Sequence, residues 1–423
     1  MRNIIFTFSF IVITGLGLFA QTNFAELDRV NYQYYLAKDY KNLKRTAQKL
    51  LEQGNDYYYL RMRLGILAYE NHRYGFASKN FIRAKEQNPF DTIINEYIYY
   101  SYLFAGRATD AKYFLRSLSS DKKNNHLTHL SPVEDPELSI NYSFNGYDVK
   151  KYLTNSLNFE AIENLSVFNI GLDFNFSQRS RSLLQYTNTR KLATFYSPSN
   201  TDGQYGTYNQ NQLYFRYKNL FTIGWEISGY SHWVFFSPEV NTTVNGRRNS
   251  SFSLISESLF GLSLSHNGWY LRGGFGLIYS NFAKSKQIST EGYLTFLPFS
   301  NLNFYSTLSG FYQVDENWGS TYQSNFDVGF KVFKYLWFES GVMVGNSFLY
   351  SRNQGVMLNN SFIIPAKSFY GTLIIPTRKF SIKINANYSE INNYSWDFVN
   401  YIKTAKVVLN SFGINTTLTI KFQ

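Results

Sequence analysis

The sequence contains no cysteine, which excludes disulfide bonds, thiolate metal sites and cysteine nucleophiles. Charged residues are also scarce: they make up 17% of the 423 residues, against about 25% in ordinary soluble domains. The formal net charge of +12 is spread along the chain without a basic block, so nucleic-acid binding is not indicated. A cysteine-free chain of this kind is compatible with an exported protein.

After the N-terminus the sequence has no run of about 20 apolar residues, so no transmembrane helix is expected. Residues 1–20 have the order of a secretory signal peptide, with Arg2 before an apolar stretch over residues 4–13 and small residues leading to Ala20. The alternative is an uncleaved anchor helix, but the apolar stretch is short and Thr7 and Ser9 interrupt it. The sequence therefore predicts export.

Residues that carry chemistry are few and scattered. The histidines are at positions 72, 126, 129, 232 and 266, and only the second and third lie close together in sequence. Ser231 and His232 are adjacent, but adjacent strand residues point to opposite faces, so they are not expected to form a lipase-like pair. The sequence also lacks a glycine-rich phosphate loop. We expect no enzyme, no metal site and no cofactor.

Aromatic residues, by contrast, are abundant: 36 Tyr and 39 Phe bring the aromatic share to 19%. The mean hydropathy is nevertheless only −0.30, because polar uncharged residues are also frequent. Transmembrane β-barrels combine these properties, since their strands have an apolar outer face, a polar inner face and aromatic girdles at both membrane interfaces.

From residue 137 onward, apolar and polar residues alternate with a period of two, which indicates strands. Residues 221–235 have an apolar face that includes Phe221, Trp225 and Ile227, and a polar face that includes Glu226 and His232. Similar alternation occurs in residues 168–176, 269–277, 326–332 and 380–388. We therefore predict an antiparallel transmembrane β-barrel of about 14 to 16 strands over residues 137–423. The alternative is a soluble β-sandwich, which does not explain so many strands of membrane length after a signal peptide.

The joints between these segments differ in length, as in outer-membrane barrels. Short joints are expected at residues 218–220, 266–268, 300–301 and 334–335. Long joints, expected to face the outside, occur at residues 197–208, 239–250 and 392–406. The last segment alternates up to Phe422, one residue before the end, and resembles the C-terminal strand that barrel-assembly machinery reads. The expected location is the outer membrane.

The N-terminal third has a helical pattern instead. Residues 58–91 match the tetratricopeptide pattern, whose period is 34 residues, at Gly65, Tyr74, Ala77, Phe81, Ala84 and Pro89. More degenerate copies occur one period upstream and one period downstream. Three repeats are about the minimum for a continuous core. We therefore predict a tetratricopeptide-like α-helical array over residues 21–118, located in the periplasm, and a polar linker over residues 119–136.

The concave face of such an array would bring together aromatic and acidic residues of the first helix in each repeat. These groove candidates are Tyr32, Tyr35, Tyr59, Met62, Tyr69, Glu70, Glu96 and Tyr100. A tyrosine-lined groove would hold an extended peptide or a glycan by stacking. The alternative is that the rings pack against one another or against the barrel rim.

The order of signal peptide, tetratricopeptide-like repeats, linker and C-terminal barrel resembles the YaiO-type outer-membrane proteins. More distantly, it resembles the porins that export poly-N-acetylglucosamine. This resemblance rests on the repeat residues given above and on the barrel periodicity. It implies a barrel that passes a polysaccharide, although the helical array of the polysaccharide porins is much longer than this one.

Alternation also predicts which charged residues face the barrel lumen. They are Asp173, Arg216, Glu226, Glu257, Arg272, Glu291, Asp327, Lys331, Glu339, Lys383 and Lys421. Both signs are present, and in a barrel of medium size such residues pair across the interior and help to fill it. We therefore favour a narrow or gated lumen over an open channel.

Two functions of different classes fit this organisation. In the first, the barrel transports or exports an envelope polymer such as a polysaccharide, and the repeats recruit a periplasmic envelope protein. In the second, the barrel is a non-conducting anchor in outer-membrane lipid, and the repeats form a scaffold for other envelope proteins.

Overall fold

The computed structural model describes residues 23–116, 118, 133–147, 159–177, 179–197, 200–244, 247–251, 255–282, 284–348, 350–359, 364–377, 379–397 and 402–421. The expected signal peptide, most of the expected linker with His126 and His129, and Phe422 lie outside these residues. The chain divides into two compact units, Met1–Thr128 with Phe299–Asn301, and His129–Pro298 with Leu302–Gln423.

The first unit is an array of helices. Residues 23–36 are helical. The helices that follow are α2 (Tyr40–Glu52), α3 (Tyr58–Glu70), α4 (Tyr74–Gln87), α5 (Thr92–Phe104) and α6 (Ala108–Arg116). The starts of α2, α4 and α6 are 34 residues apart, as are those of α3 and α5, which agrees with the period in the sequence. No helix among the described residues is long and apolar enough to cross a membrane.

Small residues allow α3 and α4 to approach closely. A Cβ added to Gly65 on α3 would lie 2.5 Å from Cε1 of Phe81 on α4, so the phenyl ring occupies the space of the missing side chain. On the same helix as Phe81, Ala77 and Ala84 are fully buried. Four of the residues on which the repeat pattern was recognised, Gly65, Ala77, Phe81 and Ala84, are therefore buried between the helices, whereas Pro89 is exposed.

The second unit is built from strands. In chain order they are β1 (Val133–Tyr147), β2 (Phe159–Asn175), β3 (Ser180–Ser197), β4 (Asn200–Thr222), β5 (Trp225–Val244), β6 (Arg247–Ser251), β7 (Ile255–Asn267), β8 (Leu271–Phe282), β9 (Ser285–Phe296), β10 (Phe304–Asp315), β11 (Gly319–Phe333), β12 (Leu336–Gly345), β13 (Tyr350–Arg352), β14 (Met357–Asn359), β15 (Ile364–Pro376), β16 (Phe380–Asp397) and β17 (Ile402–Lys421).

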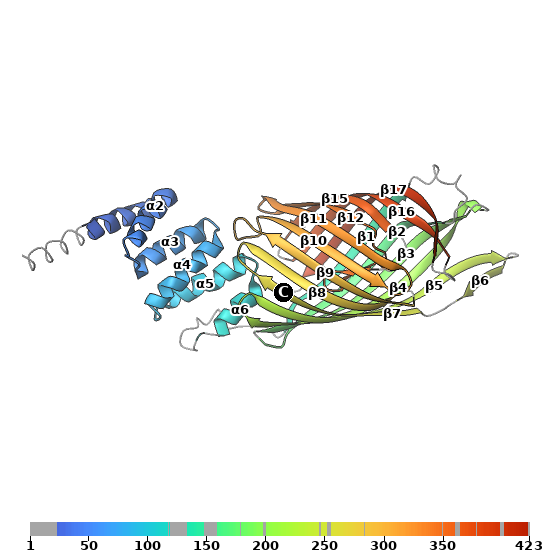
Figure 1. The fold of residues 1–423 in the computed structure, drawn as a ribbon, viewed down its shortest axis with the longest axis horizontal. Coiled ribbons are helices and arrows are strands. Elements are labelled where there is room, and N and C mark those ends of the chain that lie inside the picture. The colour runs from blue at the N-terminus through green and yellow to red at the C-terminus, as the bar shows by residue number, and fades with distance from the viewer. Residues whose placement is uncertain are drawn as a thin grey trace, which may run out of the picture. The chain divides into compact units, whose positions relative to one another are not determined.

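Fourteen of the described strands close into an antiparallel barrel (Figure 1). Each barrel strand pairs with its neighbours in chain order, β1 pairs with β17, and the pairing of β4 with β5 leaves the ring without a gap. β6 extends the barrel sheet at β5, and β13 pairs with β14 in a separate hairpin. The prediction of an antiparallel barrel is confirmed, at the lower end of the expected strand number.

The outer surface of the barrel is apolar. Along β8, Phe275, Leu277 and Tyr279 are exposed, whereas the alternate residues Ile278 and Ser280 are buried. Exposed large apolar side chains also occur on the outer faces of β1, β7, β10, β11 and β16. An apolar belt around a closed ring of strands is the surface that a membrane-spanning barrel presents to lipid.

Several expected boundaries differ from the structure. The expected long joints at residues 197–208, 239–250 and 392–406 are mostly strand, because β3 with β4, β5 with β6 and β16 with β17 continue to pair past the apolar belt. The expected short joint at residues 218–220 lies within β4, which turns only at residues 223–224. β1 begins at Val133, before the expected start at residue 137, and a bulge between Glu134 and Glu137 accommodates Pro136.

Candidate functional site: the barrel lumen

Inward-facing tyrosines cross neighbouring strands to reach carboxylates. Tyr305 on β10 pairs in register with Gly329 on β11, which pairs in turn with Glu339 on β12. The hydroxyl of Tyr305 donates a hydrogen bond to Glu339. A Cβ on Gly329 would lie 2.5 Å from Tyr305 Oη, closer than Cβ atoms approach other atoms. Glycine is needed at this position because the tyrosine ring fills the space of a side chain.

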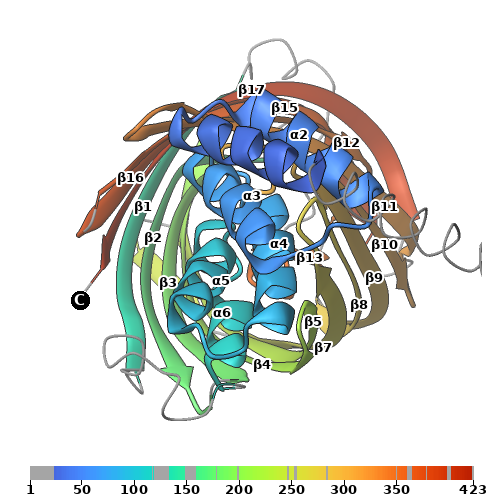
Figure 2. The ribbon, with the colours of Figure 1, turned by 90° about the vertical axis from the view of Figure 1, so that its left-hand side faces the viewer.

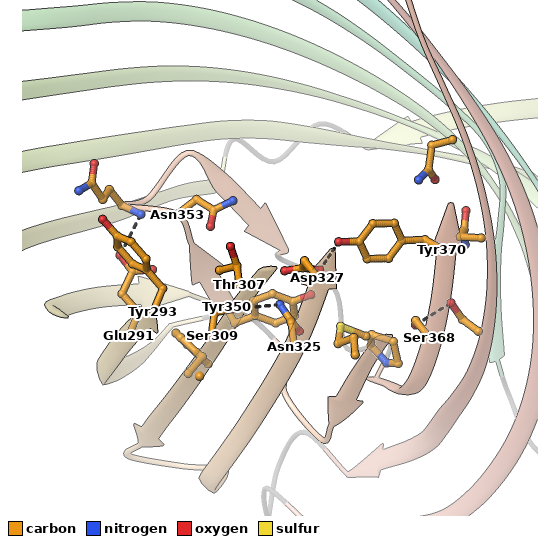
Figure 3. Close-up of a pocket in the computed structure, with 18 of the residues that line it drawn as sticks. Glu291, Tyr293, Thr307, Ser309, Asn325, Asp327, Tyr350, Asn353, Ser368 and Tyr370 are labelled. Atoms are coloured by element: carbon orange, nitrogen blue, oxygen red, sulfur yellow. Dashed lines mark hydrogen bonds between the residues drawn. The ribbon is translucent and has the colours of Figure 1, made fainter. Parts of the chain in front are cut away.

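The same arrangement recurs in the opposite direction. Tyr370 on β15 is in register with Gly341 on β12, which is in register with Asp327 on β11. The hydroxyl of Tyr370 donates to Asp327, as Figure 3 shows. These two rows connect β10, β11, β12 and β15 on the lumen side. Each of the two carboxylates also gains a hydrogen-bond donor.

A hairpin from the connection between β12 and β15 occupies part of the lumen. β13 and β14 pair with each other, and Figure 2 shows β13 inside the ring of strands. Since neighbouring barrel strands are antiparallel, this connection lies at the end of the barrel opposite to the start of β1. Wall side chains alone fill a barrel of about 8 strands, whereas about 16 strands leave an aqueous channel. In a ring of fourteen, the hairpin supplies the additional filling.

The turn of the hairpin is hydrogen-bonded to the barrel wall. The hydroxyl of Tyr214 on β4 donates to the carbonyl oxygen of Gln354 at 2.7 Å. The backbone N–H of Gln354 donates to Oε1 of Glu291 on β9 at 2.9 Å, and its side-chain amide donates to Oγ of Ser263 on β7 at 3.0 Å. The carbonyl oxygen of Gly355 accepts from Nδ1 of His232 on β5 at 2.7 Å. Four strands therefore hold two consecutive residues.

An apolar cluster lies beside these hydrogen bonds. Its buried members are Tyr214, Tyr230, Leu259, Ile278, Phe282, Trp318 and Phe348, and Val356 of the hairpin turn packs against it. Phe348, at the base of the connection, is fully buried and its ring centroid is 6.4 Å from that of Trp318. Inward-facing apolar residues of the strands, together with Trp318 and Phe348 from connections between strands, thus form a small core beside the hairpin turn.

Next to the hairpin, the lumen contains a cavity of about 890 Å³. Most of its polar lining is uncharged, being made of the amides and hydroxyls of Ser143, Thr307, Ser309, Asn325, Asn353, Gln354, Ser368, Asn385, Asn387, Ser389 and Asn415. Aromatic rings contribute as well, from Tyr293, Phe311, Tyr350 and Tyr370. Figure 3 shows Tyr293 and Tyr370 on opposite sides of this space, with Tyr350 between them. The volume lies within the usual range of ligand sites, about 300 to 1,000 Å³.

The charged residues expected in the lumen fall into several groups. Arg216, Glu291 and Asp327 line the cavity. Glu226 accepts a hydrogen bond from Lys218 at 2.9 Å, and Arg181 Nε lies 2.7 Å from Asp173 Oδ1. Both pairs join neighbouring parts of the wall, so these charges do not reach across the interior as expected.

The remaining lumen candidates lie outside the cavity. Lys331 extends over the ring of Trp337 at 5.9 Å, close to the turn between β11 and β12. Glu339 accepts from Tyr305 as described, Glu257 is buried and Lys383 is exposed. Arg272 is partly buried on β8. Lys421 is the last residue of β17, and its side chain lies outside the described part of the chain.

The expected groove residues of the helical array are partly used for packing. Tyr69 contacts the rings of Tyr74, Tyr97 and Phe104, and Tyr100 stacks on Phe104 at 5.7 Å. Tyr35 packs against the apolar core of the array.

The other groove candidates have more varied surroundings. Tyr32 is exposed beneath the Arg63 guanidinium at 5.0 Å, and Tyr59 is exposed as well. Glu70 forms an ion pair with Lys38 at 3.3 Å, Met62 is half-buried on α3, and Glu96 is half-buried on α5. The packing alternative therefore describes Tyr35, Tyr69 and Tyr100, whereas the exposed Tyr32 and Tyr59 agree with the groove hypothesis.

Tyrosine ionisation in the array gives a testable pH dependence. Burial and the hydrogen bond to Asp91 raise the pKa of Tyr58 to about 12, and burial raises the pKa of Tyr69 to about 12. An unfolded tyrosine has a pKa near 10. Because the folded state holds these protons more tightly, the stabilisation is complete below about pH 10 and is lost as pH rises towards 12.

We therefore expect the helical circular dichroism signal to fall over this alkaline interval. In the double variant Tyr58→Phe/Tyr69→Phe, the signal should fall less steeply with pH. Equal steepness in the two proteins would contradict the assignment.

Sequence reasoning missed most of the cavity lining because it considered only charged residues. Asn385 and Asn387 alternate with Ile384 and share a strand face with Lys383, so the same periodicity would have identified them. The hairpin has no comparable signal, since a strand pattern does not say whether a connection folds inward. Among the described residues, no group of three metal-ligating side chains comes together.

Neither a family model nor a curated protein matches this sequence. Solved structures with a similar arrangement include the CymD monoaromatic hydrocarbon channel (10% identity, TM-score 0.46, 70% of this chain and 90% of that chain). Others are a FadL homologue of Pseudomonas aeruginosa (8%, 0.44, 76% and 94%) and the toluene transporter TodX of Pseudomonas putida (6%, 0.43, 69% and 90%). At these TM-scores the similarity carries no conclusion about the substrate of this chain.

Proposed function

We propose that this protein is an outer-membrane barrel that transports an uncharged polar polymer, an envelope polysaccharide, and that it has no enzymatic activity. The observation that carries the proposal is the lumen cavity of about 890 Å³, whose polar lining is mainly amide and hydroxyl groups. Such groups both donate and accept hydrogen bonds, which suits the many hydroxyls of a sugar. The aromatic rings in the same lining offer apolar faces for stacking.

The charges around the cavity favour an uncharged substrate. Asp327 already accepts from Tyr370, and Glu291 accepts from the backbone of Gln354. Lys218, which also lines the cavity, is paired with Glu226. Both signs are present and most of these charges have partners, so the cavity has no strong field to select an ion.

The helical array completes the proposal. We propose that its repeats are of the tetratricopeptide type, that they lie in the periplasm and that they recruit an envelope protein, as in the YaiO-type architecture that the sequence resembles. The exposed rings of Tyr32 and Tyr59 are available for such a contact. The specific observation in favour of the alternative, a non-conducting anchor with a scaffold of repeats, is the hairpin that occupies the lumen.

Flux of a labelled neutral maltooligosaccharide into proteoliposomes would test the transport proposal. We expect uptake above that of empty liposomes, and a reduction of about two- to tenfold for Asn387→Leu, because each hydrogen bond contributes about 0.5 to 1.5 kcal/mol. Asn209→Leu is the matched control, since this exposed residue on β4 does not line the cavity. Absence of uptake above that of empty liposomes in the unmodified protein and in both variants would favour the scaffold.

A further inference from the structure

The hairpin turn has a conformation that its surroundings must maintain. Asn353, Gln354 and Gly355 have φ values of 54°, 57° and 79°, which places three consecutive residues in the left-handed region. Residues other than glycine rarely adopt this region, and they keep it only where neighbouring structure holds them. Here the neighbouring structure is the pairing of β13 with β14, whose tight turn requires positive φ values, together with the hydrogen bonds to the barrel wall.

The base and the tip of the hairpin connection are held differently. At the base, Phe348 is fully buried against Trp318, and its carbonyl oxygen accepts from Gln313 at 3.5 Å. At the tip, Gln354 forms hydrogen bonds to three strands, and the partly buried Val356 packs against the apolar cluster. Exchange of these hydrogen bonds for water costs little net free energy, whereas exposure of Phe348 would cost the burial of an aromatic ring.

The tip also forms part of the cavity. Tyr350, Asn353 and Gln354 belong to its lining, so a ligand in the cavity would contact the hairpin directly. Glu291 lines the cavity as well and accepts from the Gln354 backbone at 2.9 Å. Of the wall groups that hold the turn, Glu291 is therefore open to whatever enters the lumen, whereas Tyr214, Ser263 and His232 are buried and do not line the cavity.

We propose that the hairpin β13–β14 is a gate. In the structure described here the gate is closed, and it opens when the turn at residues 353–355 leaves the wall while Phe348 stays in place. The gate regulates the lumen to which we assign transport, and to that extent it rests on the proposed function. Contact with a polar ligand in the cavity favours opening, because a ligand hydroxyl replaces Glu291 as the acceptor for the backbone N–H of Gln354.

Ion conductance of the full-length protein in planar bilayers tests the gate without a sugar. The variant Tyr214→Phe/Ser263→Ala removes the hydroxyl that donates to the Gln354 carbonyl oxygen and the hydroxyl that accepts from the Gln354 side-chain amide. Neither substitution adds a larger side chain to the wall. Each lost hydrogen bond should raise the open probability by about two- to tenfold. The matched control is Tyr217→Phe, on the same strand as Tyr214 but exposed on the outer surface, which should conduct as the unmodified protein does.

A crosslink tests the same gate in the opposite direction. Because the chain has no cysteine, Gln354→Cys/Ser263→Cys provides two unique thiols, and a short cleavable bifunctional reagent can join them after the barrel has folded. We expect the joined protein to lose conductance and to regain it on cleavage.

Unchanged conductance in Tyr214→Phe/Ser263→Ala, or undiminished conductance after crosslinking, would overturn the gate. Variants that conduct ions but fail to pass oligosaccharide would instead overturn the proposed substrate and leave the gate in place.

Discussion

Replacing Ala84 with arginine is expected to unfold the helical array and leave the barrel folded. Ala84 is fully buried on α4, in the helix that packs between α3 and α5. A long side chain in a space for a methyl group costs about 1 to 3 kcal/mol, and a buried unpaired charge adds several more. The sum is comparable to the whole stability of a small domain, about 5 to 15 kcal/mol.

Limited proteolysis of the full-length protein, followed by electrophoresis with and without heating, would measure both units at once. Ala84→Arg should lose the array rapidly and keep a heat-modifiable barrel. Ile82→Arg adds the same side chain and charge at an exposed position of the same helix and serves as the control. An array in Ala84→Arg that is as protease-resistant as in the control would show that the packing described for α4 is wrong.

The variant Gly329→Val is expected to have the largest effect on the barrel itself. A Cβ at this position would lie 2.5 Å from Tyr305 Oη and 2.7 Å from Tyr305 Cε1, so the ring must move and lose its hydrogen bond to Glu339. Overpacking costs about 1 to 3 kcal/mol, and a partly buried carboxylate without its donor adds to that cost. In urea, Gly329→Val should therefore unfold at lower denaturant concentrations than the unmodified protein does.

Gly310→Val on the paired strand β10 is the matched control, because a Cβ there meets nothing within 4 Å. The double variant Gly329→Val/Tyr305→Ala should lose less stability than the sum of its single substitutions, because removal of the ring vacates the space for valine. Additive effects would mean that Tyr305 does not lie over Gly329.

The sequence predicted the features that arise from local periodicity. Helix starts 34 residues apart follow from Tyr40, Tyr74 and Ala108, which occupy equivalent positions in successive repeats. Alternation in the barrel region likewise predicted the apolar outer face, because side chains on a strand point to opposite sides in turn. The same rule placed Arg216, Glu291 and Asp327 in the lumen, where they line the cavity. The boundaries of strands beyond the membrane were predicted poorly, since polar hairpins there lack the apolar half of the pattern.

Only the tertiary structure decided how residues distant in sequence meet. The Tyr370 hydroxyl reaches Asp327 across 43 residues of chain, and the Gln354 amide reaches Ser263 across 91. Such contacts depend on the register between strands and on closure of the ring at fourteen strands, and a shift of one residue would move each side chain to the other face. The inward fold of β13 and β14 depends on the same closure, because the pocket for Gln354 is assembled from β4, β7 and β9 only when the barrel wall is complete.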